Sequence, residues 1–98
     1  MVRHVVLYSF VPEHPPEGRA AIVEGLVALV GVVPGLVAMK VGTDLGLMEG
    51  NFDLGIVADF VDAAAFDTYV AHPAHVEVRD TLIRPVTTNR AAIQYELV

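Results

Sequence analysis

The beginning of the chain shows a pattern of apolar positions that is typical of a buried β-strand. The segment Val2–Val11 is rich in valine, and Pro12 follows it where a strand would end. Because side chains alternate across a strand, one face carries the even-numbered residues from His4 to Phe10 and the other face carries the odd-numbered ones. Neither face is consistently polar, so we expect both faces of this strand to be covered.

A longer segment with helical spacing follows, from Pro16 to Val33. Proline suits the first turn of a helix, and the Pro34-Gly35 pair marks the end of this one. Two apolar stripes lie about 100° apart on the helix, which predicts that it packs between the sheet and a second neighbour. The first stripe consists of Ile22, Leu26, Leu29 and Val33, and the second of Val23, Val27 and Val30.

The rest of the chain alternates between short strands and helices. Asp62 is a suitable N-cap for the helix that precedes the break at His72-Pro73. The predicted elements are a strand Leu36–Val41, a loop Thr43–Asn51, a strand Phe52–Phe60, a helix from Asp62 through Tyr69, a short helix Pro73–Arg84 and a strand Ala91–Val98. This order is that of the split βαβ, ferredoxin-like α+β pattern, in which helices cover one face of an antiparallel sheet. We expect residues 1–98 to form one such domain.

The composition adds a reason to expect self-association. Hydrophobic residues make up 54% of the chain, and 18 of its 98 residues are valine. A domain of this size buries only about 60–65% of the surface that its unfolded chain exposes, so an apolar excess leaves a patch in water. The uncovered face of the predicted sheet is the natural place for this patch. We therefore expect two protomers to pair through it as a homodimer.

The charge balance and the lack of cysteine exclude several functions. Six basic residues against twelve acidic ones give a net charge of −6 without a basic cluster, which disfavours nucleic acids and polyphosphates and favours a small ligand that is uncharged or weakly acidic. Without cysteine, disulfides and thiolate sites are excluded. No apolar stretch approaches the roughly 20 residues that cross a bilayer, so we expect a cytoplasmic protein without membrane contact. Arg79 and Arg84 are placed either to bind a carboxylate or to pair with acidic neighbours.

Histidines are the main candidates for chemistry, and two of them lie in the segment His72-Pro73-Ala74-His75. His75 is the best candidate for a base, because imidazole titrates near neutral pH. Tyr69 lies six residues earlier, and the break at Pro73 is able to turn its hydroxyl toward the same cavity, where it would donate to a carbonyl. The alternative is that Tyr69 is a core aromatic residue and that both histidines serve as cap and packing residues.

The strand order restricts where such a site can lie. A strand residue joins residues of the helices only from the helix-facing side of the sheet, so a site that includes His4 lies inside one protomer, between sheet and helices. Its wall then comes from the other residues on that face of the first strand: Val6, Tyr8 and Phe10. The spacing of His72 and His75 is not that of a helical metal site, and there is no phosphate loop or dinucleotide motif, so we expect no metal and no cofactor.

Several of these segments together resemble the stress-responsive dimeric A/B barrel (Dabb) family, over residues 2–98. The resemblance rests on the opening strand Arg3–Phe10, on Pro34-Gly35 with a strand that ends in Gly42, on Phe52-Asp53-Leu54 at the start of a strand, and on the segment from Tyr69 to His75. It implies a ferredoxin-like protomer that dimerises sheet to sheet into an α+β barrel. Some members of this family assemble further into rings.

A narrower similarity connects the chain with plant polyketide cyclases of the olivetolic acid cyclase type. In these enzymes a tyrosine and a histidine catalyse an intramolecular aldol condensation without a cofactor, and they correspond to Tyr69 and His75. Two further histidines of these enzymes correspond to His4 and His72. Another pocket histidine of these enzymes falls near Leu54, so this chain departs from the pattern there. The sequence leaves three alternatives open: a barrel that binds a small molecule, a cofactor-independent cyclase or lyase, and a non-catalytic structural oligomer.

Overall fold

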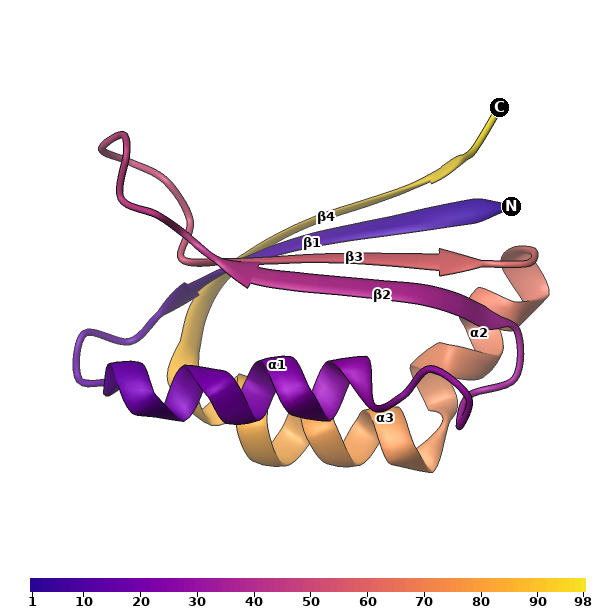
Figure 1. Cartoon of the computed structure of the whole chain (residues 1–98), viewed down its shortest axis with the longest axis horizontal. Coiled ribbons are helices and arrows are strands. Elements are labelled where there is room, and N and C mark those ends of the chain that lie inside the picture. Colours follow the sequence, from indigo (N-terminus) through magenta and orange to yellow (C-terminus); the bar gives the residue numbers. More distant parts are fainter.

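The computed structural model describes the chain from Met1 to Val98 and shows one sheet with helices on a single face (Figure 1). The sheet is antiparallel throughout, in the strand order β2-β3-β1-β4. Its strands are β1 (Val2–Phe10), β2 (Leu36–Thr43), β3 (Leu54–Phe60) and β4 (Thr87–Glu96). The order of elements and the two layers confirm the predicted ferredoxin-like α+β fold.

Three α-helices and three shorter helical turns connect the strands. The helices are α1 (Arg19–Val27), α2 (Ala63–Ala71) and α3 (Pro73–Val78), and the turns are 3₁₀ at Pro16–Gly18, π-helical at Arg79–Ile83 and 3₁₀ at Arg84–Val86. All of them lie on one side of the sheet in Figure 1, so the opposite sheet face stays open. None of the helices has the length and apolar character that crossing a membrane requires.

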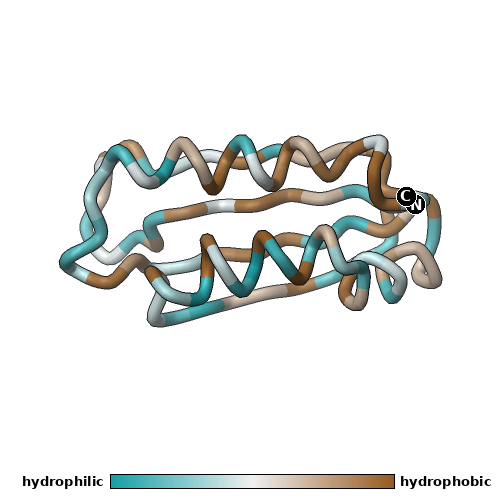
Figure 2. Tube along the Cα trace, turned by 90° about the horizontal axis from the view of Figure 1, so that it is seen from below, coloured by the Kyte–Doolittle hydropathy of each residue, from teal (hydrophilic) through white to brown (hydrophobic).

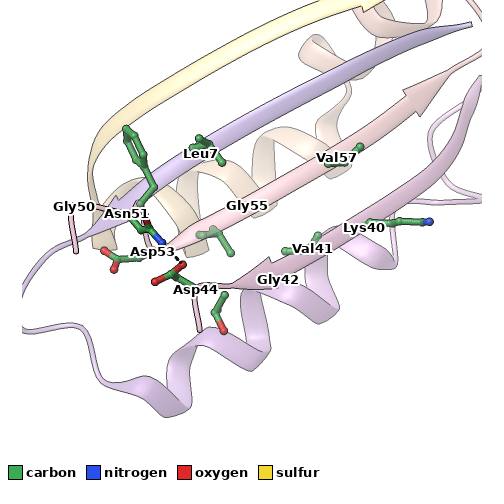
Figure 3. Close-up of a pocket in the computed structure, with 13 residues that line it drawn as sticks. Leu7, Lys40, Val41, Gly42, Asp44, Gly50, Asn51, Asp53, Gly55 and Val57 are labelled. Carbon is green, nitrogen blue, oxygen red and sulfur yellow. Dashed lines mark hydrogen bonds between the residues drawn. The ribbon is translucent and has the colours of Figure 1, made fainter. Parts of the chain in front are cut away.

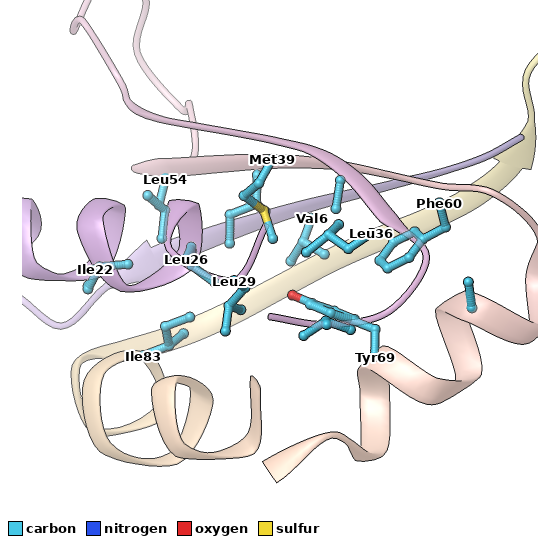
Figure 4. Close-up of a cluster of buried hydrophobic side chains, with 14 of the residues drawn as sticks. Val6, Ile22, Leu26, Leu29, Leu36, Met39, Leu54, Phe60, Tyr69 and Ile83 are labelled. Carbon is cyan, nitrogen blue, oxygen red and sulfur yellow. The ribbon is translucent and has the colours of Figure 1, made fainter. Parts of the chain in front are cut away.

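The alternation of β1 decides which residues face the helices. His4 and Val6 are 6% and 3% exposed, whereas Leu7 is 37% exposed on the open face. The neighbouring strand follows the same alternation, because Val6 pairs with Ile56 of β3. Figure 4 shows the resulting core, in which side chains from the sheet and the helices meet and Tyr69 is included. The apolar residues of the strands and of the first helical stripe therefore form one core.

The first helix is shorter than its apolar spacing predicts. It ends at Val27, and the chain continues to Val33 in turns that include a 3₁₀-type hydrogen bond from the Leu29 N–H to the Leu26 carbonyl at 3.1 Å. Gly31 then adopts a left-handed conformation with φ of 88°. The four valines in this stretch lower its helix propensity. Leu29 and Val33 are still buried, because the tighter turns keep a spacing that points both toward the sheet.

The helix α1 also packs against the helical segment that follows the His72-Pro73 break, but not through the whole predicted second stripe, because Val27 and Val30 are 45% and 40% exposed. Gly25 permits this close approach, because a Cβ at that position would lie 3.2 Å from the Leu82 side chain and 3.5 Å from Val78. The segment predicted as one helix, Pro73–Arg84, changes pitch within its length, from α3 to the π-helical turn that follows. This segment contacts α1, and its local apolar pattern does not predict the change of pitch.

Two side-chain caps define the break between α2 and α3. The Asp62 carboxylate accepts from the Ala65 N–H at 2.8 Å and begins α2, as predicted. His72 has ψ of 131°, the extended conformation that a residue before proline prefers. Its Nδ1 accepts from the Ala74 N–H at 3.1 Å and caps α3. The chain therefore turns between the two helices and brings their ends close together.

The strand limits depend on pairing as well as on local pattern. β4 begins at Thr87, earlier than predicted, because Thr87 pairs with Phe10 at the end of β1. The other strand limits differ from the predicted ones by two residues or fewer. Figure 2 shows both chain ends at the same end of the molecule, where the Leu97 N–H donates to the Met1 carbonyl at 2.8 Å. The strand β1 is thus paired with β3 from Val2 to Tyr8 and with β4 from Val2 to Phe10.

Candidate functional site

A cavity of about 440 Å³ lies between the sheet and the helices. One wall comes from β1, β3 and β4, and the others come from the three helices and the turns after α3. Its lining residues are His4, Val6, Tyr8, Leu26, Ile56, Phe66, Tyr69, Val70, His75, Arg79, Ile83, Arg84, Thr87, Thr88 and Arg90. The cavity is partly open, and apolar side chains share its lining with histidines, arginines and threonines. Its size suits a small organic ligand.

The cavity brings together five of the seven site residues that the sequence indicated. His4, Val6 and Tyr8 reach it from β1, Tyr69 from α2 and His75 from α3. The first three share the helix-facing side of one strand, so the alternation of β1 is what aligns them. The break after α2 is what brings the other two together.

Phe10 and His72, the other two indicated residues, do not line the cavity. The register between β1 and β4 shifts before Phe10, and its ring packs at the end of the core against His14, with ring centroids 4.6 Å apart. The Arg19 guanidinium lies over the same ring at 4.6 Å. His72 directs its Nδ1 to the backbone of α3, since it caps that helix. Both residues therefore stabilise the fold and do not contact the cavity.

Tyr69 and His75 are in direct contact. Their rings stack with centroids 3.9 Å apart and planes at 27°. Tyr69 is 3% exposed and points from α2 into the interior, with its hydroxyl at the inner end (Figure 4). Burial raises the pKa of the Tyr69 phenol above its ordinary value, and the nearby Tyr8 adds to this effect. The phenol therefore keeps its proton at neutral pH and is available as a hydrogen-bond donor.

The backbone determines which nitrogen of His75 is free. Nδ1 lies 3.4 Å from the Val70 carbonyl oxygen, which only accepts, so Nδ1 carries the proton in this contact. Nε2 then has a free lone pair. Burial lowers the pKa of His75 below its ordinary value, and the charge of Arg79 acts in the same direction. The ring is thus neutral near pH 7 and able to take a proton at Nε2.

His4 is held in the complementary tautomer. The Gln94 amide nitrogen, a donor, lies 2.8 Å from Nδ1, so Nδ1 accepts and Nε2 carries the proton. Burial lowers the pKa of His4 to about 4, and the charges of Arg90 and His75 add to the effect. His4 is therefore a neutral donor at neutral pH. The cavity thus combines one free imidazole lone pair with two uncharged donors, the Tyr69 hydroxyl and the His4 N–H.

Three arginines also line the cavity, and the sequence pointed to only two of them. Arg79 and Arg84 both contact Asp80, at 3.0 and 3.2 Å, so pairing with an acidic neighbour is the alternative that the structure supports for them. Arg90 was not indicated. It pairs with Tyr8 in the register of β1 and β4, which places it on the helix-facing side. Knowledge of the pairing between β1 and β4 would have identified Arg90 as a residue of the cavity.

A second hollow, of about 720 Å³, lies on the open face of the sheet (Figure 3). Gly42 and Gly55 face each other there beside Leu7, and the missing side chains leave the depression. The two carboxylates at its edge have backbone partners: Asp53 accepts from the Phe10 N–H and Asp44 from the Gly46 N–H. No histidine or tyrosine lines it. The acid–base groups therefore belong to the cavity on the other side of the sheet.

Metal ligands do not gather at either place. No three histidine, aspartate or glutamate side chains come close enough to hold a metal ion together. Of the residues that line the cavity, only His4 and His75 belong to these types.

Comparisons with known proteins agree with this fold. The family model described as Stress responsive A/B Barrel Domain (Dabb) matches residues 2–97. The chain is 31% identical over 78 residues to the stress-response A/B barrel domain-containing protein HS1 of Arabidopsis thaliana, covering 78% of this chain and 72% of that protein.

Solved structures show the same architecture. A dimeric ferredoxin-like protein of unknown function from Thermobifida fusca is 31% identical, with a TM-score of 0.89 over 98% of this chain and 90% of that one. The hydroxynitrile lyase of Passiflora edulis is 21% identical, with a TM-score of 0.82 over 96% and 90% of the two chains, and shows the fold alone. With a family model matched over nearly its whole length and a relative of 31% identity, the chain belongs to the stress-responsive A/B barrel domain (Dabb) family.

Proposed function

We propose that the chain is a single domain that binds a small carbonyl compound in the cavity between sheet and helices. The observation that carries this proposal is the convergence of His4, Tyr69 and His75 on one cavity of about 440 Å³ that also has apolar side chains in its lining. Two neutral donors, the Tyr69 hydroxyl and the His4 N–H, suit a carbonyl oxygen, and Val6 and Ile56 offer apolar contacts to the rest of the ligand.

Closing the cavity with a large side chain tests this proposal. Thr88 lies on β4 at the cavity wall and is exposed, so Thr88→Trp fills the entrance without disturbing the core. We expect calorimetric affinity for N-benzyl-3-oxobutanamide, a neutral β-keto amide, to fall at least about 10-fold. The matched control is Thr68→Trp, on an exposed position of α2 away from the cavity, which we expect to bind as the wild type does.

Equal affinities for the wild type and Thr88→Trp would contradict binding in the cavity. If the wild type binds neither this amide nor related carbonyl compounds, the domain is better described as a structural oligomer, with its histidines in packing roles.

A second candidate function, cofactor-independent cyclase or lyase chemistry, is supported by the contact between Tyr69 and His75. Nε2 of His75 takes a proton from the carbon next to a carbonyl, while the Tyr69 hydroxyl donates to the oxygen that becomes negatively charged. The enolate attacks a second carbonyl of the same molecule, and the proton on His75 moves to the new alkoxide. The reverse sequence breaks a carbon–carbon bond, as a lyase does. The Passiflora lyase shares this fold, which is compatible with such a site.

We also propose that two copies pair through the open face of the sheet. This face carries exposed apolar side chains, Leu7, Ile93 and Tyr95, whose exposed fractions are 37%, 58% and 44%. The hollow beside Gly42 and Gly55 offers space for a side chain of the partner. Burial of such a surface is favourable, and relatives with this fold are described as dimeric.

Light scattering tests the dimer. At micromolar concentration we expect twice the protomer mass of 10.5 kDa, or a multiple of that dimer mass. Ile93→Glu places a charge on the open face, at the edge strand β4, and should shift the assembly toward monomers. Val27→Glu, at an exposed position on α1, is the matched control and should leave the mass unchanged. A wild-type mass of one protomer would contradict the proposal.

A further inference from the structure

The cationic side chains of this protein are distributed unevenly. The chain has six lysines and arginines and a net charge of −6. Three of the six, Arg79, Arg84 and Arg90, line the one cavity that also holds the histidines, and no aspartate or glutamate lines it. The lining of this cavity is therefore positively charged, although the protein as a whole has a negative net charge. A positive cavity attracts anions and raises their local concentration.

The three guanidinium groups differ in what they already bind. Asp80 lies outside the cavity lining and pairs with both Arg79 and Arg84. One carboxylate therefore serves two of the cations. Arg90 forms no ion pair and no side-chain hydrogen bond within the chain. Of the three, it is the group whose planar fork of donors is free for a ligand.

The position of Arg90 relates it to the acid–base groups. It stands opposite Tyr8 in the register of β1 and β4, and Gln94, which holds His4, stands on the same side of β4. Arg90 is exposed while it also lines the cavity, so it lies at the entrance. The charge of Arg90 is among the causes that keep the pKa of His4 low, which agrees with their proximity.

We propose that the cavity selects carboxylate-bearing ligands, with the Arg90 guanidinium pairing with the carboxylate at the entrance while the apolar body of the ligand lies inward. This inference deepens the proposed function and rests on it. One guanidinium group without a partner matches one carboxylate, and it binds this carboxylate through two parallel hydrogen bonds. The ligand is then a keto acid or an aromatic acid, more specific than the uncharged or weakly acidic molecule expected from the sequence.

A matched pair of probes tests the inference. 3-Phenylpropanoate and 3-phenylpropanamide have the same shape and differ in charge. We expect the wild type to bind the carboxylate at least about 10-fold more tightly than the amide by calorimetry, since hydrogen bonds between charged groups are the strong ones. Arg90→Gln should lower the affinity for the carboxylate to that for the amide and leave the amide unchanged. Arg90→Lys should restore part of the preference, because it keeps the charge without the fork.

Lys40→Gln is the control for loss of a positive charge elsewhere, since Lys40 lies on the open face of the sheet. It should keep the full preference for the carboxylate. Equal affinity of the wild type for the two probes, or an undiminished preference in Arg90→Gln, would overturn the inference. Loss of the dimer mass in Arg90→Gln would also overturn it, because Arg90 would then pair with the partner subunit.

The neutral N-benzyl-3-oxobutanamide separates this inference from the proposed function. If the wild type binds that β-keto amide but shows no preference for 3-phenylpropanoate, carboxylate selection fails and the carbonyl-binding cavity stands. If the wild type binds none of the three compounds, both proposals fail together.

Discussion

Replacing His75 by glutamine is expected to slow the exchange of α-protons of a bound β-keto amide by about 10²- to 10⁴-fold, the usual contribution of a positioned general base. The exchange of N-benzyl-3-oxobutanamide in D₂O, followed by proton NMR, reports proton abstraction directly and requires no knowledge of the natural product. Glutamine fills a similar volume but has no lone pair basic enough to take the proton. Tyr69→Phe should slow exchange by about 10²- to 10³-fold, because it removes one donor to the developing oxyanion.

The neighbouring histidine of the same segment is the matched control. His72 caps α3 outside the cavity, so His72→Gln should cost about 1 kcal/mol of stability through the lost cap and leave the exchange rate unchanged. Equal rates for His75→Gln and the wild type would contradict the role of His75. An equal loss in His72→Gln and His75→Gln would show that the effect comes from the fold of this segment.

The pH profile of exchange adds a second readout. Only the neutral form of His75 takes a proton, and its pKa lies below the ordinary value of 6.5. The midpoint of the fall in rate should therefore lie below pH 6.5. A midpoint at or above pH 6.5 would contradict a buried imidazole base.

The free energy of unfolding should fall by about 3 kcal/mol between pH 6.5 and pH 4, because His4 has a pKa of about 4 in the folded protein and 6.5 as a free side chain. In this window the unfolded chain binds a proton that the folded chain excludes. Stability is therefore complete above pH 6.5 and is lost as the pH falls. His75 contributes with the same sign, since burial lowers its pKa too.

Urea unfolding at constant protein concentration measures this dependence. His4→Gln keeps a hydrogen-bonding partner for Gln94 but does not titrate, so its stability should change much less over the same window. Asp59 and Asp80 do not interfere, because their pKa values lie below 3.8 and their contribution is lost only at more acidic pH. An identical slope for the wild type and His4→Gln would show that His4 is not the group responsible.

The fold could be predicted where local pattern and tertiary packing agree. The valine-rich pattern of β1 marks one strand, although only its helix-facing side is covered within the protomer, and Asp62 and Pro73 mark helix limits through their own backbone chemistry. The end of α1 could not be predicted in this way, because the apolar spacing up to Val33 suits 3₁₀-type turns as well as an α-helix. The change of pitch after α3 could not be predicted either, because the local apolar pattern does not indicate it.

The candidate site divides along the same line. His4, Tyr69 and His75 could be related to one another because a strand face and a helix break are local features. His72 was assigned to the pocket by similarity, yet its position before a proline already suits a helix cap. Arg90 becomes visible only through its pairing with Tyr8, a contact between residues far apart in the chain.

The alternation of β1 also separates two kinds of evolutionary change. Even-numbered residues from His4 to Tyr8 border the cavity, and odd-numbered residues from Arg3 to Leu7 lie on the open face. Substitutions of the even-numbered residues change ligand binding, and substitutions of the odd-numbered residues change self-association. The two properties can therefore evolve independently within one strand of nine residues. A deletion of one residue within β1 would exchange the two sets and alter both properties at once.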